Sequence, residues 1–143
     1  MFILLLLAGG AYAQQKTVRI LAIGNSFSQD AVEQYLHELA EAEGILTIIG
    51  NMFIGGCSLE RHVKNARDNA PAYAYRKIGT DGKKREKGKM SLEAVLADED
   101  WDYVSLQQAS PFSGMYETYE ASLPELIEYV KAVSYTHLTL PTK

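Results

Sequence analysis

Three short apolar runs, each followed by a polar turn, dominate the hydrophobic pattern of this chain. The runs cover residues 18–23, 45–52 and 103–106, and they are rich in Val, Ile, Leu and Tyr. Continuous apolar runs of this length are typical of strands that are buried on both faces of a sheet. Because helical patterns separate the runs, they predict parallel strands joined by right-handed crossovers. We therefore expect an α/β fold with a three-layer, flavodoxin-like parallel sheet, in which strand 18–23 is central and helices cover both faces.

Helical spacing follows the first strand, with apolar residues at Val32, Tyr35, Leu36, Leu39 and Ala40. Ser28 or Asp30 would cap this helix, and Glu43-Gly44 would end it. Further helices are predicted over residues 59–69, 91–96 and 116–133, the last with a break at Pro124.

Residues 72–89 have a different pattern, with two extended arms on either side of Asp81-Gly82. Asp-Gly between extended arms is a strong signal for a β-hairpin. The basic arm, residues 83–89, predicts a solvated strand rather than a binding patch. As an insertion, this hairpin is placed to overhang a site at the edge of the sheet.

The stretch Gly24-Asn25-Ser26-Phe27-Ser28 joins the first strand to its helix. It places Ser26 at the carboxyl end of a strand and beside a helix N-terminus. Ligands of open α/β sheets bind at that edge, and a helix N-terminus offers free N–H groups to an anion or a developing oxyanion. Ser26 is therefore the first candidate for chemistry.

Three blocks of sequence occur in the order found in one enzyme family. They are GNSFS at residues 24–28, GGCS at residues 55–58 and WDYVSLQQ at residues 101–108. Together they resemble the GDSL/SGNH hydrolases, in particular a branch found in secreted bacterial proteins, and the resemblance spans about residues 18–133. Two departures stand out. Asn25 replaces the usual Asp of the first block, and the third block lacks the usual Asn.

The resemblance implies a role for one residue of each block. Ser26 would be the nucleophile, the backbone N–H of Gly56 would donate to the oxyanion, and the side-chain amide of Gln108 would replace that of the missing Asn. Two plainer interpretations stay open: Ser58 capping a helix after an ordinary loop, and glutamines that only satisfy loop backbone groups. We expect Cys57 to be a small buried thiol.

The resembled family takes its base and acid from an Asp-x-x-His pair near the C-terminus, and no such pair occurs here. His37 and His62 lie within predicted helices and are poorly placed to serve Ser26. Residues 134–143 break the preceding pattern and resemble a translated adapter, so we expect a non-native tail. Residues 14–133 would then be the N-terminal portion of a hydrolase domain whose C-terminal part is missing.

These expectations define the predicted function. The complete parent would be a serine-dependent esterase or deacetylase, acting on small-molecule esters or acylated carbohydrates, and this chain would be an inactive fragment. The alternative is a binding module for a small molecule, phosphate or glycan without catalysis. Fluorophosphonate reactivity separates them, because only an activated serine reacts.

Charge and histidine spacing limit the classes of partner, and the N-terminal residues predict the location of the protein. A net charge of −4 gives no sign of nucleic-acid binding, and three scattered histidines give no metal-ligand spacing, so we expect no metal and no cofactor. The apolar run at residues 2–7 followed by Ala11-Tyr12-Ala13 predicts a signal peptide over residues 1–13. That run is too short for a stable membrane anchor, so we expect a secreted or periplasmic protein of unknown oligomeric state.

Overall fold

The structure, a computed structural model, describes residues 16–138, with side chains as far as residue 134. Its sheet holds β1 (Thr17–Gly24), β2 (Leu46–Phe53), β3 (Tyr73–Ile78), β4 (Lys84–Met90) and β5 (Tyr103–Leu106). The helices are α1 (Ser26–Glu33), α2 (Leu36–Ala42), α3 (Leu59–Arg67), α4 (Leu92–Leu96), α5 (Tyr116–Glu120) and α6 (Leu123–Leu138), with a 3₁₀ turn at Ser110–Phe112. The predicted signal peptide, residues 1–13, and residues 139–143 lie outside this description.

The sheet is mixed, with the order β4-β3-β2-β1-β5. β1 pairs in parallel with β2 and with β5, so the three predicted parallel strands and the position of β1 between them are confirmed. The expectation of a purely parallel sheet was wrong, because the hairpin β3–β4 pairs antiparallel with the free edge of β2. The hairpin therefore extends the sheet instead of overhanging its edge, and β2 is the middle strand of five.

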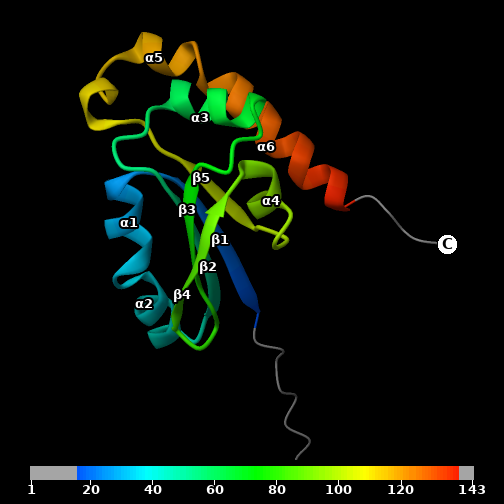
Figure 1. The fold of residues 1–143 in the computed structure, drawn as a ribbon. Coiled ribbons are helices and arrows are strands. Elements are labelled where there is room, and N and C mark those ends of the chain that lie inside the picture. The colour runs from blue at the N-terminus through cyan, green and yellow to red at the C-terminus, as the bar shows by residue number, and fades with distance from the viewer. Residues whose placement is uncertain (1–15, 139–143) are drawn as a thin grey trace, which may run out of the picture.

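Helices cover both faces of this sheet (Figure 1). Alternate residues of β1 divide between two apolar clusters, with Leu21 and Ile23 in one and Ala22 in the other. The larger cluster includes residues of α3, α4 and α6, and the smaller one includes Val32 of α1. The α/β class is thus confirmed as a five-stranded mixed sheet between helices.

The helix predicted after the first strand is two helices, α1 and α2, separated by a break at residues 34–35. The predicted apolar face was wrong in part, because Tyr35 is 69% and Leu39 65% exposed. The N-cap is Asn25 and not Ser28 or Asp30, since the Asn25 side chain accepts the N–H of Phe27. The break turns α2 so that His37 instead reaches Thr47 of β2, at 2.9 Å.

The other predicted helices are present. Ser58 caps α3 by accepting the N–H of Arg61, and Leu59, Val63 and Ala66 form its buried face. The predicted break near Pro124 lies between α5 and α6. α6 runs on to Leu138, so the first residues of the proposed tail continue a helix; whether that tail is native stays a prediction. Within the described residues, no helix is long and apolar enough to cross a membrane.

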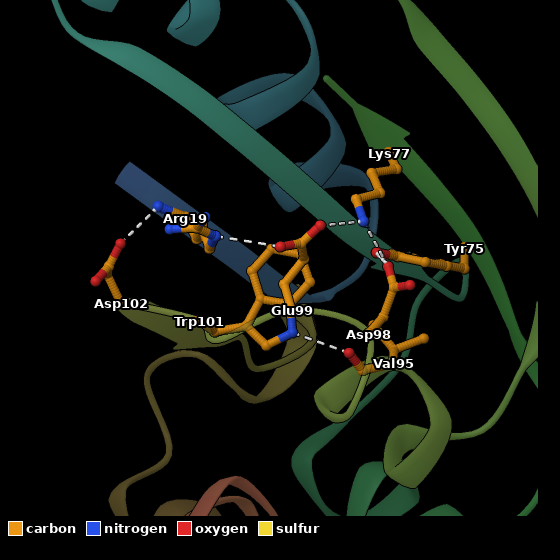
Figure 2. Close-up of polar contacts among 8 residues, drawn as sticks. All are labelled: Arg19, Tyr75, Lys77, Val95, Asp98, Glu99, Trp101 and Asp102. Carbon is orange, nitrogen blue, oxygen red and sulfur yellow. Dashed lines mark hydrogen bonds and ion pairs between the residues drawn. The ribbon is translucent and has the colours of Figure 1, made fainter. Parts of the chain in front are cut away.

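A polar network joins β3 to the loop that leads into β5 (Figure 2). Lys77 donates to Asp98 at 2.7 Å and to Glu99 at 2.6 Å, and Tyr75 donates its hydroxyl to Asp98 at 2.7 Å. Arg19 of β1 donates to Glu99 at 3.1 Å. These contacts attach the loop before β5 to β1 and to β3.

The indole of Trp101 completes this arrangement by packing against β2. A Cβ atom at Gly50 would lie 2.7 Å from Cη2 of Trp101, which leaves no room for a side chain there. The indole N–H donates to the carbonyl of Val95 at 2.9 Å, as Figure 2 shows. The glycine in the middle strand therefore allows the tryptophan to cover the sheet.

Candidate functional site

The site is built on the turn that leaves β1 and enters α1. Ser26 is the first residue of α1 and is exposed, whereas Asn25 before it is only 2% exposed. Phe27, directly after it, is 53% exposed, although it is a large apolar residue. The turn thus presents a hydroxyl and an aromatic ring at the carboxyl edge of the sheet, where ligands of α/β folds bind.

Asn25 holds the three sequence blocks together. Its side-chain amide donates to the carbonyl of Cys57 at 3.2 Å and to the carbonyl of Gln108 at 3.1 Å. Its side-chain oxygen accepts the N–H of Phe27 at 3.2 Å. An ionised Asp has no proton to donate, so it could not make both bonds to the carbonyls. The presence of Asn at position 25 therefore has a structural reason in this chain.

Gly24 allows the third block to approach the first. A Cβ atom there would lie 2.7 Å from Oε1 of Gln107 and 2.8 Å from Oγ of Ser28. Oε1 of Gln107 is 3.4 Å from the backbone nitrogen of Asn25, from which it accepts a weak hydrogen bond. Gln107 is thus the glutamine whose side chain contacts the turn, and sequence reasoning, which favoured Gln108, did not single it out.

The glycine loop of the second block lies beside this turn. Gly24 pairs with Phe53 at the end of the parallel ladder, and the N–H of Ile54 donates to the carbonyl of Gly24 at 3.2 Å. Gly56 is exposed, has a φ of +61° and has open space around its Cβ position. In the described part of the chain its N–H has no hydrogen-bond partner, so it is free to meet a ligand.

Gln108 is buried, and its side chain is occupied. Its Oε1 accepts the N–H of Leu59 at 3.0 Å and the N–H of Ala109 at 2.9 Å. Its amide donates to the hydroxyl of Thr118 at 3.0 Å. These contacts match the plainer of the two interpretations, a glutamine that satisfies loop backbone groups, while one amide hydrogen is left for other use.

Two cavities open at this edge. One of about 380 Å³ is lined by residues of the first and third blocks and the following loop: Phe27, Leu106, Gln107, Gln108, Ser110, Ser113 and Tyr119. Another of about 750 Å³ lies between α3 and α5–α6, and Gln108 lines it as well. Neither is lined by Ser26 or Gly56, so the meeting of Ser26, Gly56 and Gln108 around one small molecule stays a prediction.

Comparison with known proteins shows the family of this chain. The model of a domain of unknown function, DUF4886, matches residues 19–137. The chain belongs to the DUF4886 family. It is similar to a DUF4886 protein from Bacteroides uniformis whose crystal structure is known, with 70% identity and a TM-score of 0.80. That match covers 82% of this chain but only 45% of the B. uniformis chain. No curated protein matches the sequence.

A buried thiol and histidine lie behind the glycine loop of this DUF4886 domain. Sγ of Cys57 is 3.5 Å from Nδ1 of His62, and the hydroxyl of Tyr73 is 2.9 Å from the same nitrogen. Burial raises the pKa of the Cys57 thiol to about 11. Burial, with the nearby charge of Arg61, lowers the pKa of His62 to about 4. At neutral pH both groups are uncharged, as suits a packed cluster and not a reactive pair.

Neither His37 nor His62 has Ser26 among its hydrogen-bond partners. His62 is fully buried against Tyr73, and His37 is buried against Thr47 at the other end of β2. Across the described part of the chain, no group of acidic, His and Cys side chains is arranged to hold a metal ion. What the edge does offer is a hydroxyl, free backbone N–H groups and an adjacent cavity.

Proposed function

We propose that the complete DUF4886 protein is a serine-dependent ester hydrolase, an esterase or deacetylase of the SGNH/GDSL type, with Ser26 as its nucleophile. The observation that supports the proposal is the exposure of Ser26 at the first residue of α1, on a turn that Asn25 bonds to the loop that contains Gly56. The three blocks of the resembled family lie together there because Asn25 bonds to the second and the third. The finer, flavodoxin-like layering of that family is part of the same proposal.

In the proposed reaction, the hydroxyl of Ser26 attacks the acyl carbon of an ester while a general base takes its proton. The carbonyl oxygen then carries negative charge, and the N–H groups of Ser26 and Gly56 would stabilise it. Loss of one such donor costs about 10²–10³ in rate. The alcohol leaves with a proton, and water then releases the acyl group from Ser26. The base would come from the part of the protein that this chain does not cover.

The substrate class follows from the same resemblance. We propose small-molecule or carbohydrate esters, handled outside the cytoplasm by a secreted or periplasmic protein. The cavity of about 380 Å³ beside Phe27 has room for a small acyl or sugar group. The composition that argues against nucleic acid, a net charge of −4, is compatible with neutral ester substrates.

The test is fluorophosphonate labelling of the complete protein. We expect wild type and the matched control Ser105→Ala to be labelled and Ser26→Ala not to be. Ser105 is another exposed serine, on β5. Turnover of p-nitrophenyl acetate is expected to fall by at least about 10³-fold in Ser26→Ala. A wild-type protein that is neither labelled nor active overturns the proposal and favours the binding module for a small molecule, phosphate or glycan.

A second arm compares the complete protein with residues 14–133 alone. Neither His37 nor His62, the two histidines within residues 14–133, forms a hydrogen bond with Ser26, so the shorter chain is expected to show no Ser26-dependent turnover. Turnover at the parental rate would mean that the base lies within residues 14–133, and His37 and His62 would then be replaced in turn.

A further inference from the structure

A chain of buried polar side chains connects α1 to the hairpin on the face of the sheet that α1 covers. The hydroxyl of Ser28 is 2.7 Å from the carbonyl oxygen of Asn25 and 3.1 Å from Oδ1 of Asn51. The amide of Asn51 donates to the carboxylate of Glu33. All three side chains are buried: Ser28 is 5% exposed, Asn51 1%, and the side chain of Glu33 3%.

The chemistry of these groups fixes the direction of each bond. A carboxylate only accepts hydrogen bonds, so Asn51 must present its NH₂ to Glu33 and its oxygen to Ser28. Ser28 has one hydroxyl hydrogen, which it shares between the carbonyl of Asn25 and the oxygen of Asn51. The start of α1 is thus connected to its last residue through one side chain of β2.

The hairpin anchors the far end of this chain. Arg76 of β3 forms an ion pair with Glu33 at 2.8 Å, and Lys84 of β4 forms another at 3.2 Å. The guanidinium of Arg76 also lies over the ring of Phe53, 4.5 Å from its centroid. Arg76 is largely buried, with 12% of its side chain exposed, so Glu33 is held at a set position instead of being free in solvent.

We infer that Ser28, Asn51 and Glu33 are positioning residues that fix the first turn of α1, and through it the hydroxyl of Ser26. This inference rests on the proposed function. Asn25 bonds the turn to the loops of the second and third blocks. The Ser28–Asn51–Glu33 chain bonds the first turn of α1 to β2. A nucleophile must stand within a narrow range of angles and distances, and a misplacement of about 1 Å costs about 10²-fold in rate.

The experiment measures the rate constant of fluorophosphonate labelling in the complete protein. Ser28→Ala and Asn51→Leu each break the chain, and we expect labelling to slow by about 10- to 100-fold. Ser28→Thr keeps the hydroxyl and should restore most of the rate. The matched control is Thr47→Val, which breaks the buried bond between Thr47 and His37 on the same strand and the same face. Its labelling rate should stay at the wild-type value.

A second measurement keeps this inference separate from the proposed function. Amide hydrogen exchange of residues 24–29 should become faster in Ser28→Ala and Asn51→Leu but not in Thr47→Val. Labelling of both variants at the wild-type rate, or equal slowing in Thr47→Val, overturns the positioning role. If wild type is not labelled at all, the proposed function fails, and the exchange data alone test the positioning role. Unchanged exchange in Ser28→Ala and Asn51→Leu then refutes that role. Faster exchange in these two variants, but not in Thr47→Val, supports it.

Discussion

The side-chain amide of Asn25 donates a hydrogen bond to the backbone carbonyl of Gln108, 83 residues further along the chain, at 3.1 Å. The same amide donates to the carbonyl of Cys57. One buried NH₂ group therefore holds together the carboxyl end of β1, the loop after β2 and the loop after β5. Ser26 directly follows this residue, so we expect its position to depend on these bonds.

Replacing Asn25 with Asp tests that dependence. An ionised carboxylate would face two carbonyl oxygens without a proton to donate, so we expect a loss of about 2–4 kcal/mol in the free energy of unfolding at pH 7. The buried carboxyl group would have a raised pKa, and below about pH 4 it would be protonated and the loss would shrink. Urea unfolding of variant and wild type at both pH values gives the difference. An equal loss at both would contradict the explanation.

Gln108 offers a choice between a structural and a catalytic role. Gln108→Leu leaves the N–H groups of Leu59 and Ala109 buried without an acceptor, at a cost of about 1–3 kcal/mol each. Gln108→Glu keeps an acceptor for both and should be closer to wild type in urea unfolding. A Gln108→Glu protein that is stable but no longer hydrolyses esters would restore the oxyanion role for this side chain.

His62 should make stability fall in mild acid. Its folded pKa is lowered by burial to about 4 from an unfolded value near 6.5. Protonation therefore favours the unfolded state, and the stability present above pH 6.5 is lost as the pH falls toward 4. The loss amounts to about 3 kcal/mol between pH 7 and pH 4. Urea unfolding across this range measures it, and in His62→Phe the decline should be smaller by about that amount; an identical decline would contradict the assignment.

The Lys77 network should contribute to stability through charge pairing. Burial opposes ionisation of Asp98, but hydrogen bonds from Lys77 and Tyr75 outweigh it and lower the pKa of Asp98. Lys77→Met removes the cation between Asp98 and Glu99 and leaves only Glu99 paired, with Arg19, so we expect a loss of about 1–3 kcal/mol, greater at low salt. Adding Asp98→Asn should recover part of the loss. Urea unfolding of the two single variants and the double variant measures this recovery. If the losses of the single variants simply add in the double variant, Lys77 and Asp98 do not interact.

The hydrophobic pattern by itself determined much of this protein. Apolar runs at residues 18–23, 45–52 and 103–106 predicted three strands correctly, because buried strands need continuous apolar runs. The predicted burial of the third was wrong, since β5 lies at an edge of the described sheet and Tyr103 is 65% exposed. The hairpin was also predicted, because Asp81-Gly82 suits a tight turn between two extended arms. The position of Ser26 at the end of the first strand followed from the order of strand, turn and helix. These features are local, so local sequence specifies them.

Only the tertiary structure decided what depends on residues far apart in the chain. The pattern of residues 72–89 cannot say which strand edge the hairpin joins, and pairing with β2 made the sheet mixed. Helical spacing alone placed Leu39 in the core, whereas the break before α2 turned it to solvent. The roles of Asn25 and of the Ser28–Asn51–Glu33 chain rest on bonds between residues 3 to 83 positions apart. Such bonds are specified by packing in three dimensions, which residue order does not reveal.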